Sequence, residues 1–299
     1  MFQIISDGSC DLSPEQIESA GITVVPFYVA LDGTTYKKEG VELTPHDFFE
    51  YCILHPECSP KTSMPSVQDY IEAFTPYLDQ GKDILCYCIT KRFSGSANSA
   101  AVAKMILQEE YPDREIRVVD STLVTGLLGL LLMELSDYAR KGHSLQETWE
   151  RGEEIKKNAA IYFTIEDLRY LAKGGRIGKL ADLAVRGLRI RPIICFRNGE
   201  LYPIGISVGR RHSFIKVAEI VSRTLREQNI DPAHYAFALG WGFDQAEAEP
   251  FFQRIRALFR GAFGKEPDFI PIQIGATIGV HTGPFPVGFG MIEKALPEI

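Results

Sequence analysis

The sequence predicts an α/β protein of two domains, in which a mainly parallel α/β/α sandwich precedes an α+β domain with a mixed sheet. Its length of 299 residues is more than one ordinary hydrophobic core accommodates. Short β-branched runs alternate with helical patterns in the first half, which is typical of a parallel sheet covered by helices. After residue 144, paired strand patterns replace this alternation. We therefore expect domains at residues 1–158 and 159–299, with a cleft between them.

Strands followed by capped helices fill the first half of the sequence. Ser13 precedes a Pro at the first helical position and a Gln three residues later, which is the pattern of a capping box. Thr44 and Ser66 open two further helices in the same style. The predicted strands are residues 2–6, 23–29, 84–89 and 116–119, and the predicted helices begin near residues 14, 45, 67, 95 and 123.

The second half mixes helices with paired strands. The Asn198-Gly199 dipeptide separates two apolar runs and is a strong signal for a tight β-hairpin. Two apolar runs interrupted by Gly and Pro complete the chain. The predicted strands are residues 193–196, 201–206 and 235–241, and the predicted helices are residues 144–158, 212–227 and 246–259.

Composition excludes several classes of protein. The net charge of -7 argues against nucleic-acid binding, which relies on clustered Lys and Arg. The longest strongly apolar segment, residues 123–133, is far shorter than the roughly 20 residues of a membrane span. The first residues lack a secretory pattern, and the six cysteines lack CxxC or zinc-site spacing. We therefore expect a cytoplasmic protein with free thiols, no metal site and no cofactor, whose contact with membranes is only transient.

Small and hydroxylated residues gather in four loops next to the predicted strands. In an open α/β sheet, ligands bind beyond the carboxyl ends of the strands. The turn at residues 94–99 leads into a helix, so its free amides and the positive end of the helix dipole favour an anion. The same residue types also cap helices, which is the simpler explanation for any single loop. The candidates for an anion loop or for supporting positions are Asp7, Ser63, Gly95, Ser96, Asn98 and Ser121.

Motifs of nucleotide sites and hydrolases are incomplete. Residues 174–180 have the wrong spacing for a phosphate-binding loop and lack the hydroxyl after Lys179. Ser94 lacks the first glycine of a GxSxG elbow. His281, flanked by Gly279 and Gly283, is the one histidine in a motif-like setting, although a lone histidine is more often a hydrogen-bonded structural residue. These residues alone leave a binding site and a Ser94/His281 esterase both open.

Six segments together resemble the DegV family in their order and spacing. The resemblance implies an EDD fold of two domains, the first similar to dihydroxyacetone kinase substrate domains, with a fatty acid buried between them. It also implies a non-catalytic role as the acyl-carrying subunit of a bacterial fatty acid kinase. The six segments are residues 6–12, 61–66, 94–100, 120–121, 167–177 and 281–284.

The resemblance puts the carboxylate ligands at Thr62 and Ser94, with His281 and Arg176 close to the head group. Hydroxyl groups and a helix N-terminus hold an ionised carboxylate by charge-assisted hydrogen bonds without burying an unpaired charge. An arginine pairs with a carboxylate or an acyl phosphate through two parallel hydrogen bonds. For the tail, the runs at residues 125–131, 161–171 and 183–194 line a tunnel or belong to the core.

The sequence thus favours a carrier that presents the carboxylate of a C14 to C18 fatty acid to a separate ATP-dependent kinase. One rival is an enzyme, either the Ser94/His281 esterase or a small-hydroxyketone-binding enzyme that uses His281 covalently. Another rival is a lipid-responsive interaction protein without a kinase partner. The basic residues that would dock the kinase, or form an ordinary charged face, are Arg176, Arg189, Arg191, Arg210 and Arg211.

Overall fold

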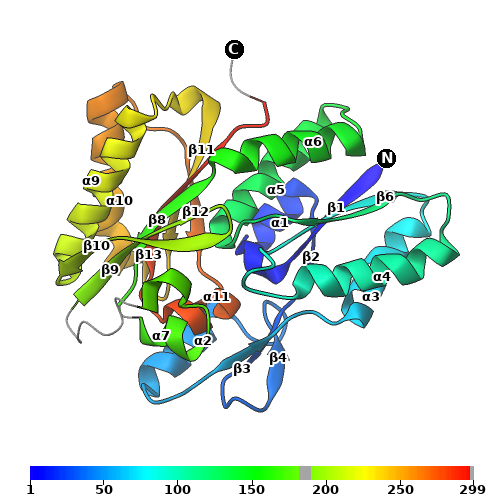
Figure 1. Cartoon of the computed structure of the whole chain (residues 1–299), viewed down its shortest axis with the longest axis horizontal. Coiled ribbons are helices and arrows are strands. Elements are labelled where there is room, and N and C mark those ends of the chain that lie inside the picture. Colours follow the sequence, from blue (N-terminus) through cyan, green and yellow to red (C-terminus); the bar gives the residue numbers. More distant parts are fainter. Residues whose placement is uncertain (167, 182–189, 297–299) are drawn as a thin grey trace.

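The computed structural model describes residues 1–166, 168–181 and 190–296, and its two larger sheets stand on opposite sides of the molecule (Figure 1). The first sheet is parallel, with the order β2-β1-β6-β7. The second is mixed, with the order β10-β9-β8-β13-β11-β12. The predicted fold class, a parallel sheet followed by a separate mixed sheet, is confirmed. The domain boundary at residue 158 stays a prediction.

Helices cover both faces of the parallel sheet, which consists of β1 (Phe2–Asp7), β2 (Thr23–Val25), β6 (Asp83–Cys88) and β7 (Ile116–Asp120). Along β6, Cys86 and Cys88 face α3 (Val67–Leu78) and α4 (Ser96–Glu110). Leu85 and Tyr87 face α1 (Pro14–Ala20), α5 (Thr125–Arg140) and α6 (Leu145–Ile155). The strand order reverses between β1 and β6, so the carboxyl ends of these two strands form the switch point where such sheets bind ligands.

Long helices cover only the outer face of the mixed sheet. Its strands are β8 (Ala160–Thr164), β9 (Ile190–Arg197), β10 (Glu200–Val208), β11 (Tyr235–Trp241), β12 (Phe269–Gln273) and β13 (Val287–Glu293). The long helices α9 (Arg210–Glu227) and α10 (Gln245–Phe263) pack on its outer face, and α5 approaches the inner face (Figure 1). The predicted hairpin is confirmed, because Asn198 and Gly199 have φ values of 52° and 76° between β9 and β10.

The single strand predicted for residues 23–29 is wrong. The chain forms β2 in the parallel sheet and then β3 (Tyr28–Ala30) in a separate sheet of order β4-β3-β5. Pro26 lies between the two strands and has no amide hydrogen to continue a ladder. β4 (Tyr36–Lys38) and β5 (Lys61–Ser63) complete the small sheet, in which Thr62 pairs with Val29. This unpredicted sheet fixes the position of Thr62.

Two short helices, α7 (Arg169–Lys173) and α11 (Ala276–Thr282), pack against each other near α2 (Pro45–Leu54), where the two large sheets approach (Figure 1). A Cβ atom added at Gly283 would lie 2.5 Å from the ring of Tyr170. A Cβ atom at Gly279 would lie 2.6 Å from Phe48 of α2. These glycines therefore permit close helix contacts that no larger residue allows. None of the helices in the described ranges is both long and apolar enough to cross a membrane.

Candidate functional site

A cavity of about 370 Å³ lies between the inner face of the mixed sheet, α5, α11 and the loop that precedes α4. Its volume falls within the range of small-molecule sites, which is roughly 300–1,000 Å³. Most of its wall is apolar, and its polar side chains come from a few loop and helix positions. This combination of an apolar body and a few polar groups fits a ligand of the same character.

The floor of the cavity is a trough along the two middle strands of the mixed sheet. Alternation along β13 directs Phe289 and Met291 to the outer helices and leaves Gly288 and Gly290 on the inner face. The antiparallel register places Gly240 and Ala238 of β11 opposite these glycines. The strands β8 and β12 on either side contribute larger side chains to the cavity wall, namely Ile161, Phe163 and Ile272.

Polar groups from four separate segments meet in the wall. Nε and Nη2 of Arg176 donate to the carbonyl oxygen of Phe93 at 3.1 and 2.9 Å, which ties the loop after α7 to the loop before α4. A Cβ atom at Gly95 would lie 2.8 Å from Sδ of Met64, which follows β5. A Cβ atom at Gly174 would lie 2.1 Å from Nδ1 of His281. α11 also contacts β5, which lies more than 200 residues earlier in the chain.

The loop before α4 presents a hydroxyl and a helix N-terminus to the cavity. Oγ of Ser94 accepts a hydrogen bond from the amide of Ser96 at 3.2 Å, and α4 begins at Ser96. Amides in the first turn of a helix have no acceptor within the helix and carry a partial positive charge. Ser94 and Gly95 are both in the cavity wall, so this terminus suits an anionic head group.

His281 is neutral at pH 7. Burial, followed by the nearby positive charge of Arg176, lowers the pKa of His281 to about 4. Its Nδ1 atom is buried and has no hydrogen-bond partner among the described residues. Thr277, one turn earlier on the same face of α11, is also in the wall, and its Oγ1 likewise has no partner in the described part of the chain. Both residues add polar groups to an otherwise apolar wall.

A family model described as an uncharacterised protein of the DegV family matches residues 1–294. The chain belongs to the DegV family. A DegV domain-containing protein of Deinococcus radiodurans is 29% identical over 288 residues, which cover 96% of this chain and 97% of the relative. A stearic-acid-binding protein from Eubacterium ventriosum is 34% identical, with 99% of each chain covered and a TM-score of 0.93. A DegV lipid-binding protein from Thermotoga maritima is 25% identical, with 100% of both chains covered and a TM-score of 0.80.

The motif residues of this DegV chain converge on the cavity. Thr62, Ser94, Arg176 and His281 are all in the wall, although they come from four separate segments. The guanidinium group of Arg176 is engaged by the carbonyl oxygens of Phe93 and Gly174. It therefore holds the Ser94 loop in place. Ser63 and Gly95 are in the wall as well, whereas Asp167 of the motif lies outside the described residues.

Asp7 and Ser96 support this loop from beneath the cavity. The carboxylate of Asp7 is fully buried and accepts hydrogen bonds from Oγ of Ser96 at 2.6 Å and from the amide of Ile89 at 3.0 Å. It also accepts one from Oγ of Ser9 at 2.5 Å, and Oγ of Ser96 shares a hydrogen bond with the hydroxyl of Tyr70. Burial raises the pKa of Asp7. Neither Asp7 nor Ser96 is part of the cavity wall.

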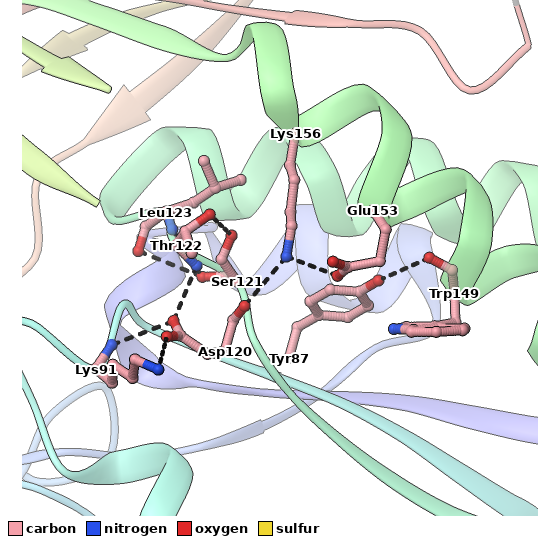
Figure 2. A network of polar contacts seen from close by, with 9 residues as sticks. All are labelled: Tyr87, Lys91, Asp120, Ser121, Thr122, Leu123, Trp149, Glu153 and Lys156. Atoms are coloured by element: carbon pink, nitrogen blue, oxygen red, sulfur yellow. Dashed lines mark hydrogen bonds and ion pairs between the residues drawn. The ribbon is translucent and has the colours of Figure 1, made fainter. Parts of the chain in front are cut away.

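Ser121 and Asn98, candidates for an anion loop or for supporting positions, are not in the wall. Figure 2 shows Ser121 in a polar network at the carboxyl end of β7, where its Oγ accepts from the amide of Leu123 at 3.0 Å. In the same network Nζ of Lys156 donates to the carbonyl oxygen of Asp120 at 3.2 Å. Asn98 is exposed on α4. Neither residue therefore lines the cavity, and a supporting role for Ser121 and Asn98 stays a prediction.

The expected tunnel and docking residues are only partly in the wall. Of the predicted runs, residues 125–127, Ile161, Phe163 and Leu171 line the cavity, whereas residues 190–194 do not. Residues 183–189, which include Arg189, lie outside the described residues. Nη2 of Arg191 pairs with Glu166 at 3.1 Å, and Arg210 pairs with Glu247 through two hydrogen bonds, while Arg211 is exposed. Among the described residues, no group of His, Cys, Asp and Glu side chains is placed to hold a metal ion.

Two buried carboxyl groups flank the start of α11. A Cβ atom at Gly275 would lie 2.6 Å from Oδ1 of Asp11 and 2.5 Å from Oε1 of Glu39. Burial, followed by the charge of Glu39, raises the pKa of Asp11 well above its ordinary value. Oγ1 of Thr125 donates to Oδ2 of Asp11, whereas Oδ1 has no partner among the described residues. The folded protein therefore binds the proton of Asp11 more tightly than the unfolded chain does.

We expect Asp11→Asn to stabilise the protein at pH 8 by about 1–3 kcal/mol, because an amide replaces one of two buried acids and donates to the other. The raised pKa means that Asp11 contributes most below its unfolded value of 3.8 and that this contribution falls as the pH rises. The gain over wild type, measured by urea denaturation, is therefore larger at pH 8 than at pH 4. The exposed Asp137→Asn variant is the control, and an equal gain at both pH values would contradict the expectation.

Proposed function

We propose that this protein binds one long-chain fatty acid in the cavity, with its tail along the trough and its carboxylate among Thr62, Ser94, Thr277 and His281. The observation that carries this proposal is the apolar trough whose wall also holds a small set of polar residues, namely Thr62, Ser94, Thr277 and His281. The similarity to a stearic-acid-binding protein at 34% identity supports it. Burial of roughly 16 methylenes at about 0.8 kcal/mol each gives on the order of 13 kcal/mol before association costs.

We further propose that the protein is a cytoplasmic carrier and presents the carboxylate to a separate ATP-dependent kinase, which forms the acyl phosphate. Two features favour a carrier over an esterase. His281, with a pKa of about 4, is a weak base at pH 7. The Oγ atom of Ser94 is engaged with the amide of Ser96, where it supports the helix N-terminus.

Native mass spectrometry of the purified protein tests the binding step, followed by lipid extraction under denaturing conditions. We expect wild type to carry one C14 to C18 fatty acid. The Thr62→Ala/Ser94→Ala variant is expected to lose it, because two hydrogen bonds to a charged group contribute about 1.5–3 kcal/mol each. The exposed hydroxyl pair Ser19→Ala/Thr34→Ala is the matched control. A wild-type protein that stays empty after incubation with a fatty acid panel would overturn the proposal.

Incubation of the loaded protein with ATP tests the presentation step, with and without a bacterial fatty acid kinase. Hydroxylamine converts an acyl phosphate to a hydroxamate that mass spectrometry detects. We expect product only when the kinase is present. Product formed by the loaded protein and ATP alone would show that the chain is itself catalytic. Absence of product with the kinase present would remove the presentation step and leave fatty acid binding in place.

A further inference from the structure

Two glycines in the trough lie inside strands where the backbone does not require glycine. Gly240 is in β11 and Gly290 is in β13, and neither has a positive φ. An interior glycine weakens a strand, and it often marks the close approach of a ligand or of another backbone. Both glycines are in the cavity wall. Their occurrence there therefore needs a reason other than backbone conformation.

The space around these glycines shows that the protein's own packing does not exclude a side chain. A Cβ atom at Gly290 would lie 3.6 Å from Cδ2 of Leu127 and 3.7 Å from Cβ of Ala238, which are ordinary contact distances. A Cβ atom at Gly240 would lie 3.7 Å from its nearest neighbours. By contrast, a Cβ atom at Gly288 would lie 2.8 Å from Cβ of Phe163. At Gly240 and Gly290 the omitted volume therefore remains part of the cavity.

The register between β11 and β13 places pairs of residues at successive depths along the trough. Gly288 pairs with Gly240, Gly290 pairs with Ala238, and Ile292 pairs with Ala236. Because successive residues on one face are about 7 Å apart along a strand, each pair forms one level of the trough. The first two levels are in the wall, whereas the third is not, and Ile292 is fully buried in the core. The level of Gly290 and Ala238 is thus the last one before the floor is closed.

A second feature of the same cavity points independently to a ligand. The side chain of Thr277 is only 4% exposed, and its Oγ1 atom has no hydrogen-bond partner among the described residues. Together with Thr62, Ser94 and His281, it gives an otherwise apolar cavity a few polar groups, as a ligand with a polar head and an apolar body requires. The carboxyl end of α11 continues through Gly283 into β13, so the polar groups of α11 lie at the end of the trough opposite Ile292.

We propose that Gly290, with Ala238 beside it, sets the longest acyl chain that the trough accepts. The inference rests on the proposed function and deepens it. A fatty acid anchored by its carboxylate near His281 extends along the levels of Gly288 and Gly290 toward Ile292. The end of its tail then lies over the missing side chain of Gly290. A methyl group at this position shortens the trough without disturbing its wall.

The test compares Gly290→Ala with wild type in competition for an equimolar panel of C12, C14, C16 and C18 saturated acids, read by native mass spectrometry. We expect the ratio of C18 to C14 binding to fall roughly tenfold or more, as is usual when a pocket lacks room for a methylene. The melting temperature of the empty protein is expected to stay the same or rise, because alanine replaces a strand glycine. Weakened folding alone would instead lower the melting temperature and reduce the binding of all four acids alike.

Two further variants keep the result interpretable. Gly205→Ala changes a glycine of β10 in the same sheet, where a Cβ atom would lie 3.6 Å from Lys216 and outside the cavity wall, so its chain-length profile should match wild type. Ala238→Gly deepens the last level and should shift binding toward longer acids. If wild type binds acids and both trough variants keep its profile, the inference is overturned and the proposed function stands. If wild type binds none, both are overturned.

Discussion

The Asp7→Ala variant is expected to lose about 3–5 kcal/mol of unfolding free energy, because several buried donors lose the carboxylate that accepts from them. The carboxylate of Asp7 accepts from Ser9, Ile89 and Ser96 at the switch point between β1 and β6. Alanine leaves the buried amide of Ile89 and the hydroxyls without this acceptor, at a cost of about 1–3 kcal/mol for each group that finds no substitute. Urea denaturation followed by circular dichroism measures the loss.

The Asp7→Asn variant is the control for shape, since it keeps one acceptor oxygen and removes the charge. We expect it to be less stable than wild type and more stable than Asp7→Ala. The alanine variant should also bind fatty acid more weakly, because Ser96 begins the helix that carries the Ser94 loop. A loss of less than about 1 kcal/mol in Asp7→Ala would contradict a supporting role for this network, since that is the usual effect of an arbitrary substitution.

The Gly174→Ala variant is expected to displace His281 and to abolish fatty acid binding in a titration. The added Cβ atom would lie 2.1 Å from Nδ1 of His281, which is far closer than atoms can approach. The backbone at Gly174 has φ of -76°, so alanine is otherwise acceptable there. Overpacking of this kind costs about 1–3 kcal/mol. We therefore expect a lower melting temperature together with the loss of binding.

A double-mutant cycle separates this contact from other effects. His281→Ala in the Gly174→Ala background removes the clashing ring, so the double variant should be more stable than Gly174→Ala. Gly261→Ala on α10 is the control for replacing a glycine by alanine, because nothing lies within 4 Å of the added atom there. It should gain up to about 1 kcal/mol and bind normally. Equal melting temperatures for Gly174→Ala and wild type would contradict the predicted clash.

Features specified by neighbouring residues were predictable from the sequence. The capping boxes at Ser13 and Thr44 start α1 and α2 as expected, since each cap depends on residues within one helical turn. The strand predicted at residues 235–241 coincides with β11. The small sheet was missed, because β3 and β4 are only three residues long and β3 also pairs with β5, more than 30 residues later in the chain. A local pattern carries no signal for such partners.

The same contrast between local and long-range information applies to the candidate site. Thr62, Ser94, Arg176 and His281 were named from the resemblance of their segments to the DegV family, and all four are in the wall. Thr277 was missed, since only its place one turn before His281 on an unpredicted helix brings it into the wall. The floor glycines were also missed. Their role depends on the register between β11 and β13, which the sequence of either strand does not reveal.

Glycine and alanine in the trough leave the inner face of the mixed sheet without the large side chains that would normally fill a hydrophobic core there. Under the proposed function, the acyl chain supplies that missing part, and the empty protein is the less stable form. A free ligand at 100 times its dissociation constant stabilises its host by about 2.7 kcal/mol. Since such a difference changes the fraction of unfolded chains about a hundredfold, intracellular proteases would remove the empty form first. The abundance of this protein would then follow the supply of fatty acid in the cell.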